Sequence, residues 1–387
     1  MTDTAPAARA LFAELTSAEP VGLWSAPGRV NLIGEHTDYN GGLALPFAID
    51  RRTRVAVRQR PDDRIRIASD VDGADPQPEA VAATLATAGE AHGWSRYVLG
   101  VVHVLRRELG IEGRGFDALV TSDVPIGAGV SSSAALESAM LVALDELWDL
   151  GLERSRMVRL GQLVENDVVG AATGTLDQIA VLLAARDHGV LIDFRTGTAA
   201  TVPLGFRAAG LEILVIDSLV RHDHSSGGYG QRRRECEQAA ATAGVATLRE
   251  IDPADVERWA DRMPPPVHRR MRHIVTDTER ARLVAQLLAE GRARDVGPIL
   301  TDGHRSQRDD FENSVAAIDA AVKAANAAGA LGARMTGGGF GGAAIALVQR
   351  ADAARIGRQV AEAVQRAGHA RPIVFPVDAA DGAGRDA

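Results

Sequence analysis

Residues 26–42 read APGRVNLIGEHTDYNGG, and this stretch concentrates hydrogen-bonding side chains and four glycines in one short segment. The apolar residues Val30, Leu32 and Ile33 predict a short buried strand, with the polar cluster at its exit. Carboxylate, imidazole and amide groups together suit a ligand rich in hydroxyls, because each hydroxyl both donates and accepts a hydrogen bond. Glycines let the backbone approach such a ligand closely. The stretch therefore predicts a binding site for a polyhydroxylated molecule.

A second stretch, residues 123–135, reads DVPIGAGVSSSAA and lies between a predicted strand and a predicted helix. Its two glycines free the backbone, and its three serines stand at the start of the helix, where N–H groups and the helix dipole attract anions. One serine would be enough to cap the helix, so three of them favour phosphate binding over capping. The stretch is neither a Walker A loop nor a Rossmann fingerprint.

A third stretch, residues 332–342, reads GARMTGGGFGG, with glycine at five of its last six positions. Such a run cannot form the interior of a helix, because each glycine there costs about 1 kcal/mol relative to alanine. A generic tight hairpin is one interpretation. A loop that folds over the phosphate-binding stretch is the other.

The pattern Gly-Arg-x-Asn-Leu-Ile-Gly-Glu-His-x-Asp-Tyr in the first stretch resembles the sugar-binding signature of galactokinases, which belong to the GHMP kinases. The second and third stretches resemble the nucleotide loop and the third motif of the same family, in the same order. The resemblance covers nearly the whole chain. It implies an ATP-dependent kinase that phosphorylates a sugar.

For ATP, the resemblance implies contacts from the phosphate loop and from two earlier positions: Ser69, Trp94, Gly127, Ala128, Gly129, Val130, Ser131, Ser132 and Ser133. It also implies that Mg²⁺ meets Ser133 and Glu165, since Mg²⁺ favours one or two carboxylates together with phosphate oxygens. A Glu at a helix end is, by itself, more often simply solvated. For Trp94, packing in the core is the alternative to a nucleotide contact.

For the sugar, the resemblance implies contacts from residues of the first stretch and from one later aromatic residue: Glu35, His36, Thr37, Asp38 and Tyr229. Tyr229 precedes the arginine-rich segment 232–234, as a sugar-contacting Tyr does in the family. The chain departs from the family at Gly230, where relatives often carry Asn, so a plain packing role for Tyr229 is the alternative.

The catalytic residues implied by the resemblance are Asp177 and Arg29. A Glu-Asn pair at 165–166, followed twelve positions later by Asp177-Gln178, matches galactokinases, although Leu176 replaces the Met that relatives commonly carry. Asp177 faces the anomeric hydroxyl by this analogy. It either acts as a general base, with Arg29 keeping the carboxylate ionised, or only orients the hydroxyl. The residues alone leave both mechanisms open.

The fold implied by the resemblance is α+β, with a ribosomal-protein-S5-like N-terminal domain, a ferredoxin-like C-terminal domain and the active site in the cleft between them. We expect these domains at 1–205 and 206–380, followed by a frayed tail at 381–387 that is rich in Gly, Ala and Asp.

Local patterns predict the individual elements. β-Branched and alternating runs predict strands at 55–57, 64–68, 116–121, 211–217 and 372–377, and a strand–loop–strand unit at 333–347. Apolar residues at helical spacing predict helices at 94–109, 131–150, 154–167, 177–185, 232–243, 267–290, 314–328 and 351–367.

Composition and charge argue against several classes of protein. The net charge of −8 argues against nucleic-acid binding, and the mixed charge around the arginine run 232–234 predicts an ordinary helix face. The single cysteine, Cys236, excludes an intrachain disulfide and is expected to be buried. Neither a signal peptide nor an apolar run long enough to span a membrane is evident. We therefore expect a cytoplasmic protein, and a monomer is compatible with the sequence.

The expected activity is the transfer of phosphate from ATP to the C1 hydroxyl of α-D-galactose. The nearest alternative is another sugar 1-kinase of the family, acting on N-acetylgalactosamine or L-arabinose. Mevalonate or homoserine kinase fits less well, because Glu35, His36 and Asp38 suit a polyol better than a mono-acid. A non-catalytic galactose sensor is a further alternative, although both the phosphate loop and Asp177 are intact.

Overall fold

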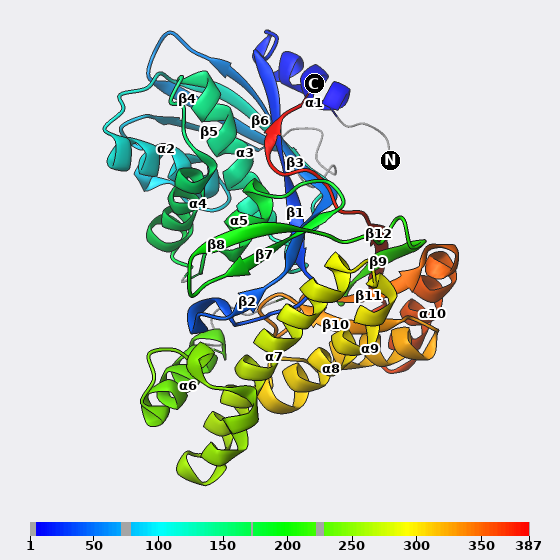
Figure 1. Cartoon of the computed structure of the whole chain (residues 1–387). Coiled ribbons are helices and arrows are strands. Elements are labelled where there is room, and N and C mark those ends of the chain that lie inside the picture. Colours follow the sequence, from blue (N-terminus) through cyan, green and yellow to red (C-terminus); the bar gives the residue numbers. More distant parts are fainter. Residues whose placement is uncertain (1–4, 71–78, 172, 222–227, 387) are drawn as a thin grey trace.

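The computed structural model describes residues 5–70, 79–171, 173–221 and 228–386 as an α+β protein built around three sheets (Figure 1). The largest sheet has six strands in the order β13-β1-β3-β6-β4-β5. Its strands are antiparallel except for the pair β4 and β6. Their bounds are β1 Gly22–Asn31, β3 Pro46–Gln59, β4 Arg64–Asp70, β5 Glu79–Thr84, β6 Phe116–Ser122 and β13 Gly384–Arg385.

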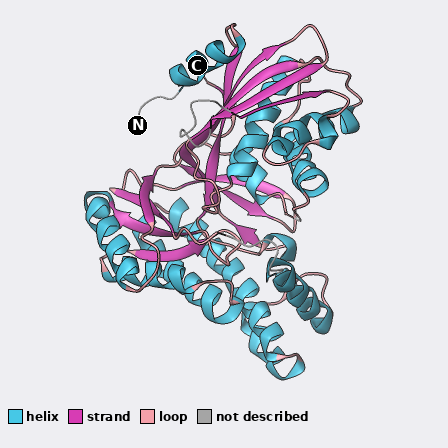
Figure 2. Ribbon diagram, turned by 180° about the vertical axis from the view of Figure 1, so that it is seen from behind, coloured by secondary structure: helices cyan, strands magenta, loops and turns pink. Residues whose placement is uncertain are grey.

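Helices cover both faces of this sheet, as Figures 1 and 2 show from opposite sides. One face packs against four helices through a large apolar core that includes Val55, Ile67 and Leu141. The other face packs against α1 through a smaller cluster around Phe12. The helices are α1 Ala5–Thr16, α2 Ser95–Leu109, α3 Ser132–Leu147, α4 Arg154–Leu163 and α5 Leu176–Leu182.

The second sheet has four antiparallel strands in the order β10-β11-β9-β12. In chain order this is the 4-1-3-2 arrangement of a ferredoxin-like βαββαβ unit, with extra helices inserted between β9 and β10. The strands are β9 Leu211–Asp217, β10 Gly332–Thr336, β11 Ala343–Gln349 and β12 Ile373–Val377. The sheet packs through one face on α9 Ala316–Ala327 and α10 Ala353–Arg366.

A single apolar core joins the two halves of the chain. It contains Val30 and Phe47 from β1 and β3, Ile345 from β11, Val284 from α7 (Pro265–Ala289) and Leu300 from α8 (Val296–Ser306). A small third sheet of β2 Leu43–Ala44, β7 His188–Asp193 and β8 Thr198–Pro203 borders this core. The exit of β1 is thereby fixed where all the sheets meet. The remaining long helix, α6 Gly228–Ala243, packs on α7, and Cys236 is buried between them, as predicted.

The predicted frayed end of the chain is wrong for residues up to 386. Strand β13 pairs with Trp24 and Ser25 of β1, and the Asp386 amide donates to the carbonyl oxygen of Leu23 over 2.8 Å. The Asp386 carboxylate also lies 3.3 Å from Nε of Arg54. A composition rich in Gly, Ala and Asp predicts disorder only when no partner strand is available.

None of the helices in the described ranges is both long enough and apolar enough to cross a membrane. The expected domain limits at 205 and 206 stay a prediction, and the return of β13 to the first sheet means that the N-terminal sheet is not contiguous in sequence.

Candidate active site

The three sequence stretches meet at the end of β1. The pairing of β1 with β3 is irregular between Pro27 and Arg29, and a Cβ atom at Gly28 would lie 2.8 Å from the carbonyl oxygen of Val130. The Arg29 amide donates to that same oxygen over 3.0 Å. Two residues further along, the amide of Asn31 donates to the Thr336 hydroxyl over 3.0 Å. The first stretch therefore lies between the second and the third.

Arg29 and Asp177 form a bidentate ion pair, which fits both their predicted catalytic roles and a purely structural ion pair, so the catalytic roles stay a prediction. Nε and Nη2 of Arg29 donate to Oδ1 and Oδ2 of Asp177 over 2.7 and 2.8 Å. Nη1 of Arg29 donates to the carbonyl oxygen of Gly129 over 2.7 Å, and the Ser131 hydroxyl donates to Asp177. Asp177 lies in the first turn of α5, and 31% of its side chain remains exposed. The carboxylate is thus held in place from two sides but remains accessible.

The phosphate-binding stretch has an unusual backbone. Gly127, Gly129 and Ser131 all adopt left-handed conformations, with φ of 72°, 73° and 58°. Such values are uncommon for a residue other than glycine. Ser131 precedes α3, but its side chain makes no capping hydrogen bond and instead contacts Asp177. The capping interpretation therefore fails for this serine.

Ser133 and Glu165 contact each other, although they are far apart in the sequence. Glu165 lies in a π-helical turn, Val164–Val169, that continues α4, and it is only 6% exposed. Burial raises its pKa, and a hydrogen bond with the Ser133 hydroxyl opposes that rise. Among the described residues, no three His, Cys, Asp or Glu side chains are placed to hold a metal ion by themselves. The pair fits a cation whose other ligands come from a nucleotide and water.

Asp38 and Tyr229 face the same region as Asp177. A Cβ atom at Gly174 would lie 2.4 Å from Oδ2 of Asp38, so this carboxylate lies against the segment that precedes α5. Burial raises the pKa of Asp38 to about 6. Burial, and then the charges of Asp38 and Asp177, raise the pKa of the Tyr229 hydroxyl. Tyr229 also packs on the His36 ring, with 4.9 Å between the ring centroids.

His36 and Thr37 have protein partners for their polar side-chain atoms. Nε2 of His36 lies 2.8 Å from the carbonyl oxygen of Gly338, and Nδ1 lies 2.8 Å from the Tyr39 hydroxyl. A carbonyl only accepts, so Nε2 carries a proton, and in the neutral ring Nδ1 then accepts from the Tyr39 hydroxyl. Burial accordingly lowers the pKa of His36 to about 4. The Thr37 hydroxyl lies 2.9 and 2.8 Å from the carbonyl oxygens of Gly34 and Leu43. These residues shape the loop, and their direct contact with a sugar stays a prediction.

Glu35 belongs to a buried cluster with Arg334 and Asp277. The Arg334 side chain is fully buried and contacts the Glu35 carboxylate directly, while its Nη2 lies 3.4 Å from Oδ2 of Asp277. The Asp277 carboxylate also accepts from the Gly34 amide over 3.1 Å. Burial raises the pKa of Glu35, and the charge of Asp277 adds to that rise. Glu35 is thus chiefly linked to the third stretch, and its contact with a sugar stays a prediction.

Ser69 and Trp94, the two residues predicted to contact ATP outside the phosphate-binding stretch, lie in separate parts of the fold. Ser69 of β4 pairs with Val120 near the carboxyl end of β6. The phosphate-binding stretch leaves the sheet at this end of β6. Trp94 precedes α2 and is partly buried against the first core, as the packing alternative requires. The places of Ser69 and Trp94 in the fold do not test whether they contact a nucleotide, so both contacts stay predictions.

Sequence reasoning missed Arg221, Arg334 and Asp277. Arg221 follows β9, and a Cβ atom at Gly127 would lie 3.0 Å from its Cδ, so it borders the phosphate-binding stretch. No local pattern signals Arg221 or Asp277, because each is brought to the site by tertiary packing. Arg334 stands inside the third stretch and could have been selected as a buried cation near an acidic loop.

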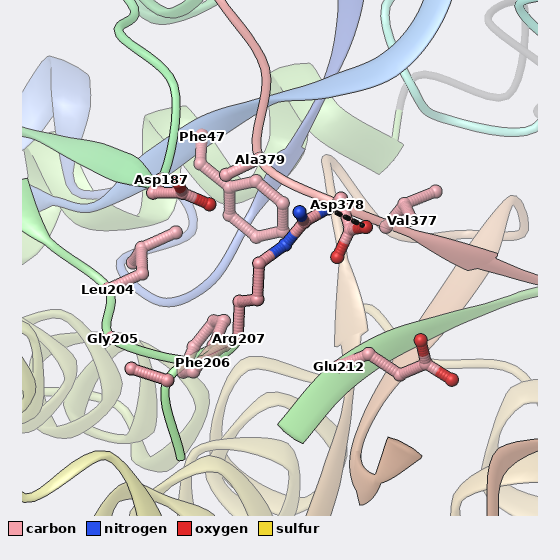
Figure 3. A pocket seen from close by; sticks show the side chains of 11 residues that line it. Phe47, Asp187, Leu204, Gly205, Phe206, Arg207, Glu212, Val377, Asp378 and Ala379 are labelled. Carbon is pink, nitrogen blue, oxygen red and sulfur yellow. Dashed lines mark hydrogen bonds and ion pairs between the residues drawn. The ribbon is translucent and has the colours of Figure 1, made fainter. Parts of the chain in front are cut away.

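A separate pocket lies where β3, β8, β9 and β12 approach one another (Figure 3). Phe47, Leu204 and Phe206 form its apolar wall, and Arg207 lies at its rim in an ion pair with Asp378 of 3.0 Å. This pocket shares no residue with the predicted site.

Comparison with known proteins agrees with this arrangement. Residues 10–59 match the galactokinase galactose-binding signature, residues 96–185 match the GHMP kinase N-terminal domain, and residues 284–366 match the GHMP kinase C-terminal domain. The chain is 45% identical to a galactokinase of Streptomyces coelicolor, over 97% of this chain and 96% of that one. It is 39% identical to a galactokinase of Bos taurus, over 97% of this chain and 95% of that one.

Comparison with solved structures also finds a galactokinase. The structure of Lactococcus lactis galactokinase complexed with galactose superposes with a TM-score of 0.92 at 29% identity, covering 99% of this chain and all of the other. A mevalonate kinase superposes with a TM-score of 0.64 at 18% identity, covering 92% of this chain and 98% of that one, a likeness of fold alone. The three matched regions, the identity along nearly the full length and the shared fold show that the chain belongs to the galactokinase family of GHMP kinases.

Proposed function

We propose that this protein is a galactokinase that transfers the γ-phosphoryl group of ATP to the C1 hydroxyl of α-D-galactose. The products are galactose 1-phosphate and ADP. In this reaction the hydroxyl oxygen forms a bond to phosphorus and the bond from the γ-phosphorus to the bridging oxygen breaks. The hydroxyl proton passes to Asp177 where that carboxylate acts as general base, and to solvent where it only orients the hydroxyl. We also infer that the reaction takes place in the cytoplasm.

One observation carries this proposal. Asp177 is held by Arg29 from the sugar-binding stretch and by Ser131 from the phosphate-binding stretch, so one carboxylate belongs to both half-sites. A group that must align a sugar hydroxyl with a terminal phosphate needs this kind of support. Correct alignment of the reacting groups supplies much of the rate enhancement in phosphoryl transfer.

The sugar would lie against Asp38, Tyr229 and Asp177. The Asp38 carboxylate accepts hydrogen bonds from backbone amides of its own turn, and two oxygens together offer about four acceptor sites. It can therefore still accept from sugar hydroxyls. The Tyr229 hydroxyl can donate or accept on the same side. Glu35, His36 and Thr37 then act mainly by holding the loop that presents Asp38.

The nucleotide would lie along residues 127–133, with Arg221 beside the first glycine and with Ser69 and Trp94 toward the base. Mg²⁺ would bind Ser133, Glu165 and the phosphates, where it neutralises the charge of the triphosphate. The buried hydroxyl–carboxylate pair supplies the hard oxygen ligands that this ion prefers. Arg29 places a guanidinium beside Asp177, which favours the negative charge that develops on the reacting oxygens.

A panel of monosaccharides tests the proposal. Purified protein with ATP and Mg²⁺ is expected to release ADP with galactose, to release far less with glucose, and to lose turnover in Asp177→Ala. N-Acetylgalactosamine and L-arabinose in the same panel separate the related sugar 1-kinases. Faster turnover with either of these, or ADP release that is independent of Asp177, would refute the assignment.

A further inference from the structure

Glu137 is a buried carboxylate that the reaction outlined above does not use. It lies on α3, one turn beyond Ser133, and it is 0% exposed. Neither of its carboxylate oxygens makes a hydrogen bond of normal geometry. The side-chain amide of Gln178, on α5, opposes the rise in its pKa, but burial outweighs this effect. A buried polar group without partners costs about 1–3 kcal/mol, so this residue needs an explanation.

The surroundings of Glu137 place it behind the proposed cation ligands. Residues four apart lie on the same face of a helix, so Glu137 and Ser133 point to the same side of α3. On that side Ser133 contacts Glu165, and α3 packs against α5, which carries Asp177. Burial, and then the charges of Glu165 and Asp177, raise the pKa of Glu137, which agrees with this placement.

We propose that Glu137 is a positioning residue for the nucleotide-bound divalent cation. From one helical turn behind Ser133, its carboxyl group supplies a second layer of hydrogen bonds to water carried by the cation, and when it carries its proton it can also donate to Glu165. This inference rests on the proposed function, because it takes the Ser133–Glu165 pair as the cation site. Mg²⁺ keeps several water ligands, and carboxylates in the second layer orient such water and the direct ligands.

The proposal explains why Glu137 is fully buried and why its carboxylate oxygens lack hydrogen-bond partners. A side chain that only packed would be better replaced by an apolar residue, because the side-chain amide of Gln178 compensates its burial only in part. A side chain that serves the cation is incompletely partnered until the cation and its water arrive. Its removal should therefore weaken cation binding without destabilising the fold. A merely structural role predicts instead that removal destabilises the fold and leaves cation binding unchanged.

The test uses the full chain and needs no sugar. Binding of Mn²⁺ is measured in the presence of a non-hydrolysable ATP analogue, together with binding of the analogue alone and the melting temperature. Glu137→Gln is expected to weaken Mn²⁺ binding about 10-fold, the lower end of the usual effect of removing a second-layer ligand. Binding of the analogue alone and the melting temperature should be retained or improved.

Ser138→Ala is the matched control. Ser138 is the next residue of α3, is equally buried and also lacks a hydrogen-bond partner, but its side chain points about 100° away around the helix. It should change neither Mn²⁺ binding nor analogue binding. Should Glu137→Gln not fold, Glu137→Asp takes its place, with a smaller loss of Mn²⁺ affinity expected.

Unchanged Mn²⁺ affinity in Glu137→Gln, or an equal loss of analogue binding without the cation, would overturn the proposal. The same loss of Mn²⁺ affinity in Ser138→Ala would also overturn it. Because galactose is absent, the result does not depend on which sugar the enzyme accepts. Failure of the unaltered protein to bind the analogue at all would instead count against the proposed function.

Discussion

At the scale of single residues, the site depends on charged groups that are held by more than one neighbour. The Asp177 carboxylate receives three hydrogen bonds from two side chains, two of them from a guanidinium whose planar geometry fixes its orientation. Arg29 and Asp177 could be selected from the sequence because they stand in recognisable patterns. The partner role of Ser131 could not, because it depends on a left-handed backbone conformation that its own residue type does not favour.

Replacing Asp177 with Asn keeps the shape of the side chain but turns an N–H group toward Arg29. We expect kcat to fall about 100-fold or more, the range for loss of a positioned proton acceptor, with a smaller change in KM for galactose. Steady-state kinetics measures both. A kcat close to that of the unaltered enzyme would show that Asp177 only orients the hydroxyl. Ser131→Ala, which removes one of three hydrogen bonds, should lower kcat less.

The ionisation of Asp38 should appear in the pH dependence of sugar use. Burial raises its pKa to about 6, so the side chain is charged above that pH and protonated below it. A carboxylate accepts sugar hydroxyls through both oxygens, and protonation removes part of this capacity. We therefore expect kcat/KM for galactose to fall as the pH drops through about 6.

Asp38→Asn provides the check on this pH effect. The variant should have a lower kcat/KM at neutral pH and should lose the acidic limb, measured with the ATP concentration saturating. An unchanged acidic limb would assign the titration to another group and would argue against Asp38 as the sugar ligand.

At the scale of elements, the sequence predicted most of the long helices but only some of the strands, and it missed β7 although Val190 and Ile192 of that strand are buried. Strand β6 and helix α3 carry clear apolar spacing, and both were predicted within a few residues of their bounds. Helix α4 was predicted to continue to 167, but it changes to a π-helical turn at Val164, which places Glu165 toward Ser133. Strand β8 was missed because it is mostly exposed and shows no apolar alternation. Spacing rules detect a buried face, and an exposed strand has none.

The pairing of β13 with β1 should contribute measurably to stability. Asp386 contacts Ser25 and Arg54 through its side chain. We expect Asp386→Ala to lower the free energy of unfolding by about 1–2 kcal/mol, since each lost hydrogen bond of this kind contributes about 1 kcal/mol or somewhat more. Urea denaturation measures this change, and kcat should not change.

Asp309→Ala is the matched control for that experiment. Asp309 is an exposed carboxylate that pairs only with its neighbour Arg308. Exposed pairs of this kind contribute little, so its removal should leave stability nearly unchanged. Equal effects of the two variants would mean that the pairing of β13 adds nothing specific.

At the scale of the whole molecule, the site exists because one shared core joins the two halves. Val30 of β1 and Ile345 of β11 belong to that core, which fixes the exit of β1 against the second sheet. The family patterns indicated that the three stretches would meet, but they gave no account of how. Arg334, Asp277 and Arg221 come from three different elements, and only the packing of those elements brings them near residues 34–35 or the phosphate-binding stretch. No local pattern encodes this placement for Asp277 and Arg221, whereas Arg334 stands inside the third stretch.

Arg334 carries the positive charge that joins the third stretch to Glu35 of the first stretch. Arg334→Met would leave Glu35 and Asp277 buried without their common partner. We expect the free energy of unfolding to fall by about 3–5 kcal/mol, as in other cases where one member of a buried ion pair is removed. Chemical denaturation measures the loss.

Adding Glu35→Gln to Arg334→Met should recover part of this stability, because Glu35 then carries no unpaired charge, whereas Asp277 still has Arg280 at 3.4 Å. No recovery in the double variant would mean that lost packing around Arg334, and not unpaired charge, sets the cost.

The position of β13 also constrains how the molecule is assembled during synthesis. Strand β1 is synthesised long before residues 384–385, which pair with Trp24 and Ser25 on its outer edge. During most of translation that edge has unpaired backbone groups, and exposed strand edges are where chains join one another. The nascent N-terminal half therefore passes through a period in which its largest sheet can recruit a wrong strand, and the pairing of residues 384–385 with β1 ends that period.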